Sequence, residues 1–244
     1  MPDILILGAS SDIAASCARK FASEGYSVWL AGRNVEQLKI QAADISIRYN
    51  VKSNVLLFDA VNFASHRSFV ESLSFVPDVV LLAFGYLGDQ QFAETDWNES
   101  LSIINSNYTG AVSILNELAN LLQKHNKGVI AGISSVAGDR GKKSNFIYGS
   151  AKAGLTVYLA GLRNRLFAHK VHVLTIKPGF VQTRMTEGMP LPKRLTAQPD
   201  AVAKDIYKAV DSRKNVIYTK PLWRYLMFVI SNIPESIFKK LSLG

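Results

Sequence analysis

The chain has 244 residues, of which 48% are hydrophobic and 19% are charged, so it can bury the core of one large domain and is not a disordered protein. Cys17 is the only cysteine, which excludes an internal disulfide, and no signal-peptide pattern precedes the first apolar run. We therefore expect a cytoplasmic protein. The net charge is +9, and the basic excess gathers after Lys193. Such a surface can attract nucleic acid, anionic lipid or phosphorylated substrates, or can simply aid solubility. No nucleic-acid-binding module or metal-ligand set is evident, so we expect neither nucleic acid nor metal.

Short apolar runs alternate along the chain with segments of helical period. The predicted strands are Ile4–Leu7, Val28–Ala31, Val55–Phe58, Val79–Ala83, Val129–Ile133, His172–Ile176 and Val216–Tyr218. Between them, apolar residues recur every three or four positions, as in Ile13, Cys17 and Phe21. This alternation predicts an α/β, single-domain Rossmann fold with a seven-stranded parallel sheet and helices on both faces.

Small residues follow the first predicted strand and open the first helix, where free N–H groups can receive a diphosphate. The residues expected there are Gly8, Ser10, Ser11, Asp12 and Ile13. Arg33 follows the second strand, where an acidic residue would favour NAD, so it predicts binding of the 2′-phosphate of NADP. Asp59, followed by Ala60, can accept a hydrogen bond from adenine or cap the next helix. The alternative for Arg33 is an ordinary surface arginine.

Tyr148 and Lys152 are four residues apart and therefore share one face of a helix. A nearby ammonium lowers the pKa of a phenol and makes it a usable acid at neutral pH. Ser135 follows the fifth predicted strand and can hydrogen-bond a substrate oxygen. By itself a Tyr-x-x-x-Lys pair is common and carries little weight.

Taken together, these segments resemble the short-chain dehydrogenase/reductase family over nearly the whole chain. The resemblance implies a catalytic set of Asn107, Ser135, Tyr148 and Lys152. It also implies that NADP(H) is held by Gly8, Ser10, Ser11, Asp12, Ile13, Arg33, Asp59, Ala60, Ala83, Gly85, Tyr148, Lys152, Pro178, Gly179, Val181 and Thr183. Residues 1–220 are then the dinucleotide-binding catalytic part, and 221–244 an amphipathic extension of the same domain. The sequence departs from the family's Gly-x-x-x-Gly-x-Gly pattern at Asp12 and Ala14, and Asp12 would bring a negative charge close to the diphosphate.

The family mechanism implied by this resemblance is hydride transfer from NADPH to a ketone. In it, Tyr148 donates the proton, Ser135 holds the carbonyl oxygen, and Lys152 lowers the pKa of the tyrosine. Asn107 supports a water that relays protons to Lys152. Members commonly form homodimers or tetramers, which we expect here as well.

Three segments resemble a narrower group within the family, the decaprenylphosphoryl-2-keto-ribose reductases. They are residues 80–89, 145–150 and 223–240. This resemblance implies a 2-keto sugar on a polyprenyl phosphate as substrate, a flavin-dependent oxidase partner, and a role in epimerisation for the cell wall. Arg184, Lys193 and Arg194 are candidates to contact the substrate phosphate, or they belong to a solvated lid.

The apolar segment from Leu222 to Ile230 is flanked by basic residues and is too short to cross a bilayer. It can lie at the inner surface of the cytoplasmic membrane, or pack on the domain or a second subunit. Two other functions stay open. One is reduction of a soluble ketone, such as a sugar, a steroid or an acyl thioester, and the other is a non-catalytic NADP-binding regulator.

Overall fold

The apolar runs form a parallel sheet in the order β3-β2-β1-β4-β5-β6-β7, in a computed structural model that describes residues 1–241. The strands are β1 (Asp3–Leu7), β2 (Ser27–Gly32), β3 (Ser53–Leu57), β4 (Val79–Leu82), β5 (Val129–Ile133), β6 (His172–Pro178) and β7 (Val216–Thr219). Each predicted strand is present with ends shifted by at most two residues. The predicted α/β fold with a seven-stranded parallel sheet is therefore confirmed.

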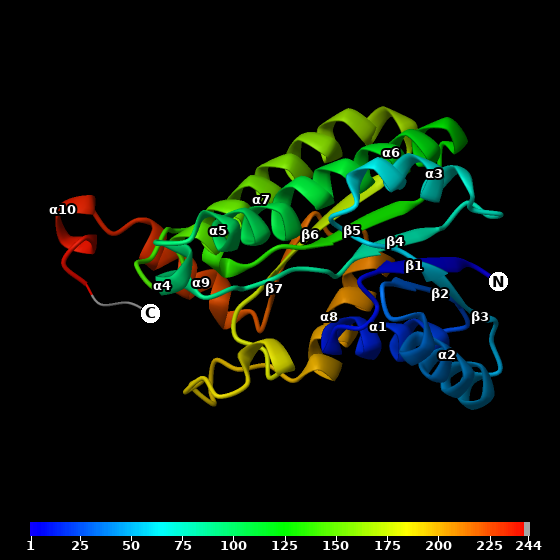
Figure 1. Cartoon of the computed structure of the whole chain (residues 1–244), viewed down its shortest axis with the longest axis horizontal. Helices are drawn as coiled ribbons and strands as arrows, with labels where there is room; N and C mark the ends of the chain where they lie inside the picture. Colours follow the sequence, from blue (N-terminus) through cyan, green and yellow to red (C-terminus); the bar gives the residue numbers. More distant parts are fainter. Residues whose placement is uncertain (242–244) are drawn as a thin grey trace.

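Helices connect the strands and cover both faces of the sheet (Figure 1). The longer helices are α1 (Asp12–Ser23), α2 (Val35–Tyr49), α5 (Trp97–Ile104), α6 (Gly110–His125), α7 (Phe146–Leu166), α8 (Pro199–Asp211) and α9 (Leu222–Ser231). The shorter ones are α3 (His66–Glu71), α4 (Gln90–Ala93) and α10 (Glu235–Phe238). Single turns are η1 (Phe63–Ser65), the π-helical η2 (Asn105–Thr109), η3 (Val136–Gly138), η4 (Phe167–His169) and η5 (Arg184–Thr186).

Two apolar cores lie on opposite sides of the sheet. On one side, residues such as Cys17 and Phe21 of α1 and Ile206 of α8 pack against the strands. On the other side, the packing residues include Leu118 of α6 and Leu159 of α7. Because both faces are covered, the strands are apolar throughout, as expected for a parallel sheet. Burial raises the pKa of the Cys17 thiol, which acts as a core residue.

The direction in which the chain builds the sheet reverses between β1 and β4, which are neighbours although β2 and β3 come between them in sequence. The loops after these two strands therefore separate and open a crevice at the carboxyl end of the sheet, where ligands bind in such folds. The predicted site residues lie on loops and helix ends around this crevice.

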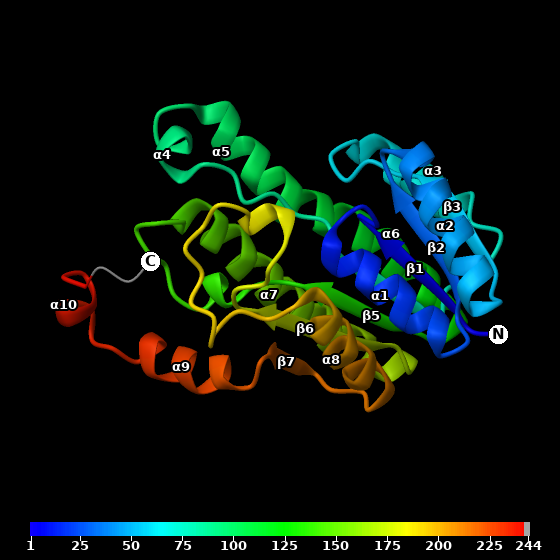
Figure 2. The same ribbon diagram turned by 90° about the horizontal axis from the view of Figure 1, so that it is seen from below.

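The C-terminal arm, residues 221–241, packs along the end of the molecule near β7 (Figure 2). Trp223 and Met227 of α9 are buried against Val136 and partly buried neighbours. The opposite face of α9 exposes apolar residues, among them Tyr225 and Phe228. Packing on the domain thus accounts for one face of this helix. Within residues 1–241, no helix combines the length and apolar character needed to cross a membrane. Residues 242–244 of the predicted 221–244 extension lie outside the described residues.

Arg140 fastens the arm to the segment that follows η3. Its guanidinium donates to the carbonyls of Ser231 at 3.2 Å and Ile233 at 3.3 Å, and it forms an ion pair with Glu235 at 2.5 Å. The same guanidinium lies 4.2 Å from the ring centroid of Phe238. The position of the arm is therefore coupled to the segment that carries Ser135.

Candidate active site

The turn between β1 and α1 requires glycine at its first position. Gly8 has a φ of +82°, and a Cβ there would lie 2.6 Å from the Cβ of Phe84. Ser11 caps α1 by accepting a hydrogen bond from the Ala14 amide at 3.2 Å, while its hydroxyl donates to the Ala83 carbonyl at 3.2 Å. These contacts hold the turn against the end of β4. The N-terminal residues of α1 are left lining the crevice.

Arg33 lies at the carboxyl end of β2 and is exposed. Among residues 1–241 it has no hydrogen-bond or ion-pair partner, so its guanidinium is available to a ligand. A Cβ at Gly32 would lie 3.6 Å from the Ser10 hydroxyl oxygen, so the Ser10 side chain lies at the same strand end. This arrangement of a free guanidinium near a hydroxyl suits a phosphate.

Asp59 follows β3, but it does not cap the next helix. Its Oδ1 accepts a hydrogen bond from the Val61 amide at 3.1 Å, and the residue that precedes η1 is Asn62. The carbonyl of Ala60 lies so close to Gly110 that a Cβ on this glycine would clash with it. Asp59 and Ala60 thus form a tight turn wedged against α6, and the adenine contact of Asp59 stays a prediction.

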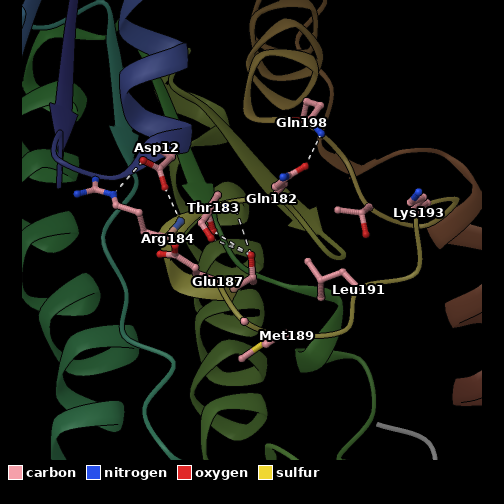
Figure 3. Close-up of a pocket in the computed structure, with 12 residues that line it drawn as sticks. Asp12, Gln182, Thr183, Arg184, Glu187, Met189, Leu191, Lys193 and Gln198 are labelled. Atoms are coloured by element: carbon pink, nitrogen blue, oxygen red, sulfur yellow. Dashed lines mark hydrogen bonds and ion pairs between the residues drawn. The ribbon is translucent and has the colours of Figure 1, made fainter.

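Asp12, which replaces a glycine of the family pattern, forms an ion pair with Arg184. The Arg184 amide donates to one carboxylate oxygen at 2.7 Å, and its Nε donates to the other at 3.1 Å (Figure 3). The Arg184 guanidinium also donates to the carbonyl of Ser10. The carboxylate is therefore neutralised beside the first turn of α1. Arg184, a candidate for the substrate phosphate, is instead engaged by Asp12.

Asn107 is buried in the π-helical turn η2. Its Nδ2 donates to the carbonyls of Tyr86 at 2.5 Å and Ile103 at 2.8 Å. A Cβ at Gly85 would lie 2.7 Å from Asn107 Oδ1 and 3.4 Å from Lys152 Nζ. The lack of a side chain at position 85 therefore lets the asparagine and lysine approach the same point at the end of β4. A π-helical turn is an uncommon feature that often marks functional sites.

Ser135, Tyr148 and Lys152 line one cavity. Ser135 comes from the start of η3, and the other two come from the first turns of α7. The Lys152 Nζ lies 5.7 Å from the centroid of the Tyr148 ring and donates to the carbonyl of Ile133 at 3.1 Å. Ser134 is turned away, because its hydroxyl donates to the Lys152 carbonyl at 2.9 Å. The structure thus brings together three of the four residues that the family resemblance implies as the catalytic set.

Burial shifts the pKa values of the lysine and the tyrosine toward their neutral forms. It lowers the pKa of Lys152 to about 8, and it raises the pKa of Tyr148 to about 12, which a hydrogen bond from Ser135 opposes. The expected lowering of the Tyr148 pKa by the Lys152 ammonium is therefore not seen in the ligand-free protein, because burial outweighs it. The phenol is protonated at neutral pH and can donate. The ammonium, mostly charged at neutral pH, uses one hydrogen bond within the described chain and has donors left for a ligand.

The segment after β6 carries the predicted Pro-Gly motif, and the C-terminal arm covers it. A Cβ on Gly179 would clash with the Trp223 indole, whose Nε1 donates to the Leu195 carbonyl at 3.0 Å. Val181 is buried, and Thr183 precedes η5. Pro178, Gly179, Val181 and Thr183 all line the same cavity as Tyr148. Trp223 lines it as well, which the sequence did not indicate.

This cavity, the catalytic cavity, has a volume of about 680 Å³ and extends from the first turn of α1 to the segment before α7. Its outer part is lined by apolar side chains, including Leu87, Met185 and Met189. Two polar residues that were not predicted as site residues, Lys142 and Asn145, also line it. Nothing in the sequence pattern distinguished them from other residues of a polar loop.

A second pocket of about 750 Å³ adjoins the catalytic cavity, and Asp12 and Arg184 line both (Figure 3). Gln182 and Gln198 bridge its wall through a hydrogen bond of 2.7 Å, and Lys193 stands at its rim. Lys193 is exposed, and Arg194 contributes its carbonyl to Lys220. The structure therefore does not place these two predicted basic residues in the catalytic cavity.

The short chain dehydrogenase family model matches residues 3–193 of the chain. The protein belongs to the short-chain dehydrogenase family. An uncharacterized oxidoreductase of Mycobacterium tuberculosis is 35% identical over 98% of this chain and 96% of its own. A 3-oxoacyl-[acyl-carrier-protein] reductase of Aquifex aeolicus is 30% identical over 75% of each chain.

Solved structures of short-chain dehydrogenases share the fold. One from Sphingobium yanoikuyae, in complex with NADPH, has a TM-score of 0.80 and 22% identity, over 97% of this chain and 98% of that one. An actinorhodin polyketide ketoreductase variant with NADPH has a TM-score of 0.79 and 20% identity, over 89% and 95%. Family membership confirms the predicted oxidoreductase class of this short-chain dehydrogenase. Family membership does not show that the protein belongs to the narrower group of keto-sugar reductases.

Proposed function

We propose that the protein is an NADPH-dependent reductase that converts a ketone to a secondary alcohol. The observation that carries the proposal is the convergence of Ser135, Tyr148 and Lys152 on one cavity that also contains the α1 turn. A phenol that stays protonated at neutral pH, beside a lysine with free donors, is the arrangement needed to give a proton to a carbonyl oxygen.

NADPH fits the residues present. Gly8 lets the turn pack against Phe84, so that the first residues of α1, Ser11 to Ile13, line the cavity where a diphosphate can bind, and the Arg33 guanidinium is free for the 2′-phosphate. The residues proposed to hold the cofactor are the set that the family resemblance implies, which begins with Gly8 and ends with Thr183. When bound, the cofactor supplies the hydride. The short-chain dehydrogenase structures that contain NADPH support this choice.

The chain's own residues control the proton. Ser135 binds the carbonyl oxygen, and Tyr148 gives it the phenolic proton. The Lys152 ammonium stabilises the phenolate that remains, because opposite charges attract strongly in a buried site. Asn107, fixed by the carbonyls of Tyr86 and Ile103, lies with Lys152 beside Gly85. Proton relay through a water at that point is part of the proposal.

For the substrate, we propose a 2-keto sugar carried on a polyprenyl phosphate, made by a flavin-dependent oxidase partner. The apolar outer wall of the catalytic cavity and the exposed apolar face of α9 support a substrate that is partly lipid. The same face, together with the basic residues Arg224, Lys239 and Lys240 of the arm, supports peripheral contact with an anionic membrane. We propose that the protein acts as a homodimer or tetramer. A soluble acyl thioester is the alternative that the likeness to the Aquifex reductase favours.

The test is NADPH oxidation with a panel of keto sugars, with and without a polyprenyl phosphate, and with an acyl-thioester ketone. We expect turnover of the lipid-linked keto sugar and loss of at least about a thousandfold in kcat for Tyr148→Phe, with NADPH binding kept. Full activity of Tyr148→Phe would remove the assigned acid. Turnover of the thioester alone would replace the keto-sugar substrate.

A further inference from the structure

Two polar side chains of the catalytic cavity have unmet bonding capacity. Lys142 and Asn145 lie on the segment between η3 and α7, and both line the cavity beside Tyr148. Asn145 Oδ1 is buried and accepts no hydrogen bond within residues 1–241. The Lys142 ammonium is part-buried and also has no hydrogen-bond or ion-pair partner in this described range. A buried acceptor without a partner and a desolvated cation both cost free energy that a ligand can return.

Two other desolvated lysines of this region have a partner within the described chain. Lys177 pairs with Asp139 at 2.5 Å, and Lys152 donates one hydrogen bond to the Ile133 carbonyl. Lys142 has neither kind of partner, although burial lowers its pKa. Its ammonium is therefore open to a ligand.

The backbone fixes these two side chains relative to each other and to Tyr148. The Asn145 amide donates to the Lys142 carbonyl at 3.1 Å, which closes a turn, and the Asn145 carbonyl accepts from the Gly149 amide at 2.7 Å. Two residues further on, the Ile147 amide donates to the Gln90 side chain of α4 at 3.2 Å. The two side chains are thus presented from an anchored segment at the start of the helix that carries Tyr148.

The segment that carries Lys142 is separated from the expected diphosphate position. It lies near α4 and α9, away from the start of α1 (Figure 2). A ligand group at Lys142 therefore belongs to the substrate side of the cavity. A lysine ammonium suits a phosphate, and a free amide oxygen suits a hydroxyl donor.

We propose that Lys142 and Asn145 form a substrate subsite for a ketone that carries a phosphate group and a free hydroxyl, with Lys142 on the phosphate and Asn145 Oδ1 on the hydroxyl. The inference rests on the proposed reductase function and names the chemistry of its substrate. The phosphate can belong to a soluble sugar phosphate or to a lipid phosphate, which share this chemistry.

The experiment is calorimetric titration of the protein saturated with NADP⁺, which binds substrates without turning over a ketone. The probes are ribulose 5-phosphate, unphosphorylated ribulose and citronellyl phosphate. The variants are Lys142→Gln, with Lys142→Arg as the charge-conserving form and the adjacent, exposed Lys143→Gln as the matched control. Circular dichroism of each variant checks the fold.

We expect Lys142→Gln to weaken the binding of ribulose 5-phosphate by at least about tenfold and to leave the binding of ribulose unchanged. Lys142→Arg and Lys143→Gln should stay close to the unaltered protein. If citronellyl phosphate binds and its binding depends on Lys142, the phosphate that the subsite takes is a lipid phosphate. If citronellyl phosphate does not bind in this way, the phosphate belongs to a soluble sugar. Asn145→Ala should weaken the binding of both sugars, because both carry the hydroxyl.

The subsite is overturned if Lys142→Gln leaves ribulose 5-phosphate unaffected, if it weakens ribulose equally, or if the phosphorylated ketone does not bind at all. Lys142-dependent binding without reduction of any ketone by NADPH would keep the subsite and reject the reductase. Reduction of ketones without any dependence on Lys142 would keep the reductase and reject the subsite. The failure of one proposal can therefore be distinguished from the failure of the other.

Discussion

The Asp12 carboxylate accepts hydrogen bonds from both the backbone amide and the Nε of Arg184, although the two residues are 172 positions apart. The pair joins the first turn of α1 to the loop after β6. It explains how a carboxylate is tolerated at a position where the family has glycine, since the guanidinium compensates its charge. The ion pair is partly exposed, so its contribution to stability is small.

Arg184→Ala is expected to weaken NADPH binding by about five- to twentyfold, because it leaves the Asp12 charge uncompensated near the diphosphate. Fluorescence titration of NADPH measures the effect. Asp12→Ala added to Arg184→Ala should restore most of the affinity. If the double variant binds no better than Arg184→Ala alone, the pair has no electrostatic role in cofactor binding.

Arg33→Ala is expected to raise the KM for NADPH by at least about tenfold while leaving the KM for NADH nearly unchanged. The reason is that Arg33 is exposed and has no partner in the described part of the chain, so its loss removes only a ligand contact. The thermal midpoint should not change, since a free surface side chain contributes within about 0.5 kcal/mol. Equal increases for both cofactors would contradict the assignment to the 2′-phosphate.

Lys152→Met is expected to stabilise the ligand-free protein by about 1–3 kcal/mol near pH 7 while abolishing activity. The folded-state pKa of Lys152, about 8, is below its model-peptide value of 10.5, so the charged form is destabilised on folding. That cost is present below about pH 8 and disappears as the pH rises from about 8 to 10.5. Urea unfolding at about pH 7 and pH 9.5 should therefore show a smaller advantage of the variant at the higher pH. A constant advantage would point to packing instead.

The rate of ketone reduction is expected to fall as the pH rises through about 8. Above this value Lys152 loses its charge in the free enzyme, whereas Tyr148 remains protonated up to about 12. Profiles of kcat/KM against pH report these groups. Lys152→Arg should keep its charge and move the falling limb to higher pH, at reduced activity. A limb that does not move in the variant would assign the titration to another group.

Much of the fold follows from local sequence. Runs such as Val129–Ile133 are apolar at every position, which in a chain with alternating helices indicates a strand buried on both faces. The spacing of Tyr148 and Lys152 predicts that they share one helical face. Their catalytic roles, and that of Ser135, came from the family resemblance and not from local pattern.

The contacts that were missed join distant parts of the chain. Arg184 was a candidate for a substrate phosphate or for a solvated lid, and its pairing with Asp12 was missed because a sequence shows a charge but not which carboxylate will reach it. Trp223 was expected only as part of an apolar tail, yet it covers Gly179. Lys142 was not singled out from the sequence, and its partial burial is evident only from the packing of the segment before α7.

The contact of Trp223 with Gly179 also bears on how the molecule is made. The ribosome synthesises the Gly8 turn and every strand of the sheet before it reaches Trp223. The residues that form the nucleotide side of the crevice are thus made long before the α9 wall, which comes from one of the last segments of the chain. The substrate side can be complete only after α9 docks and Arg140 contacts the arm.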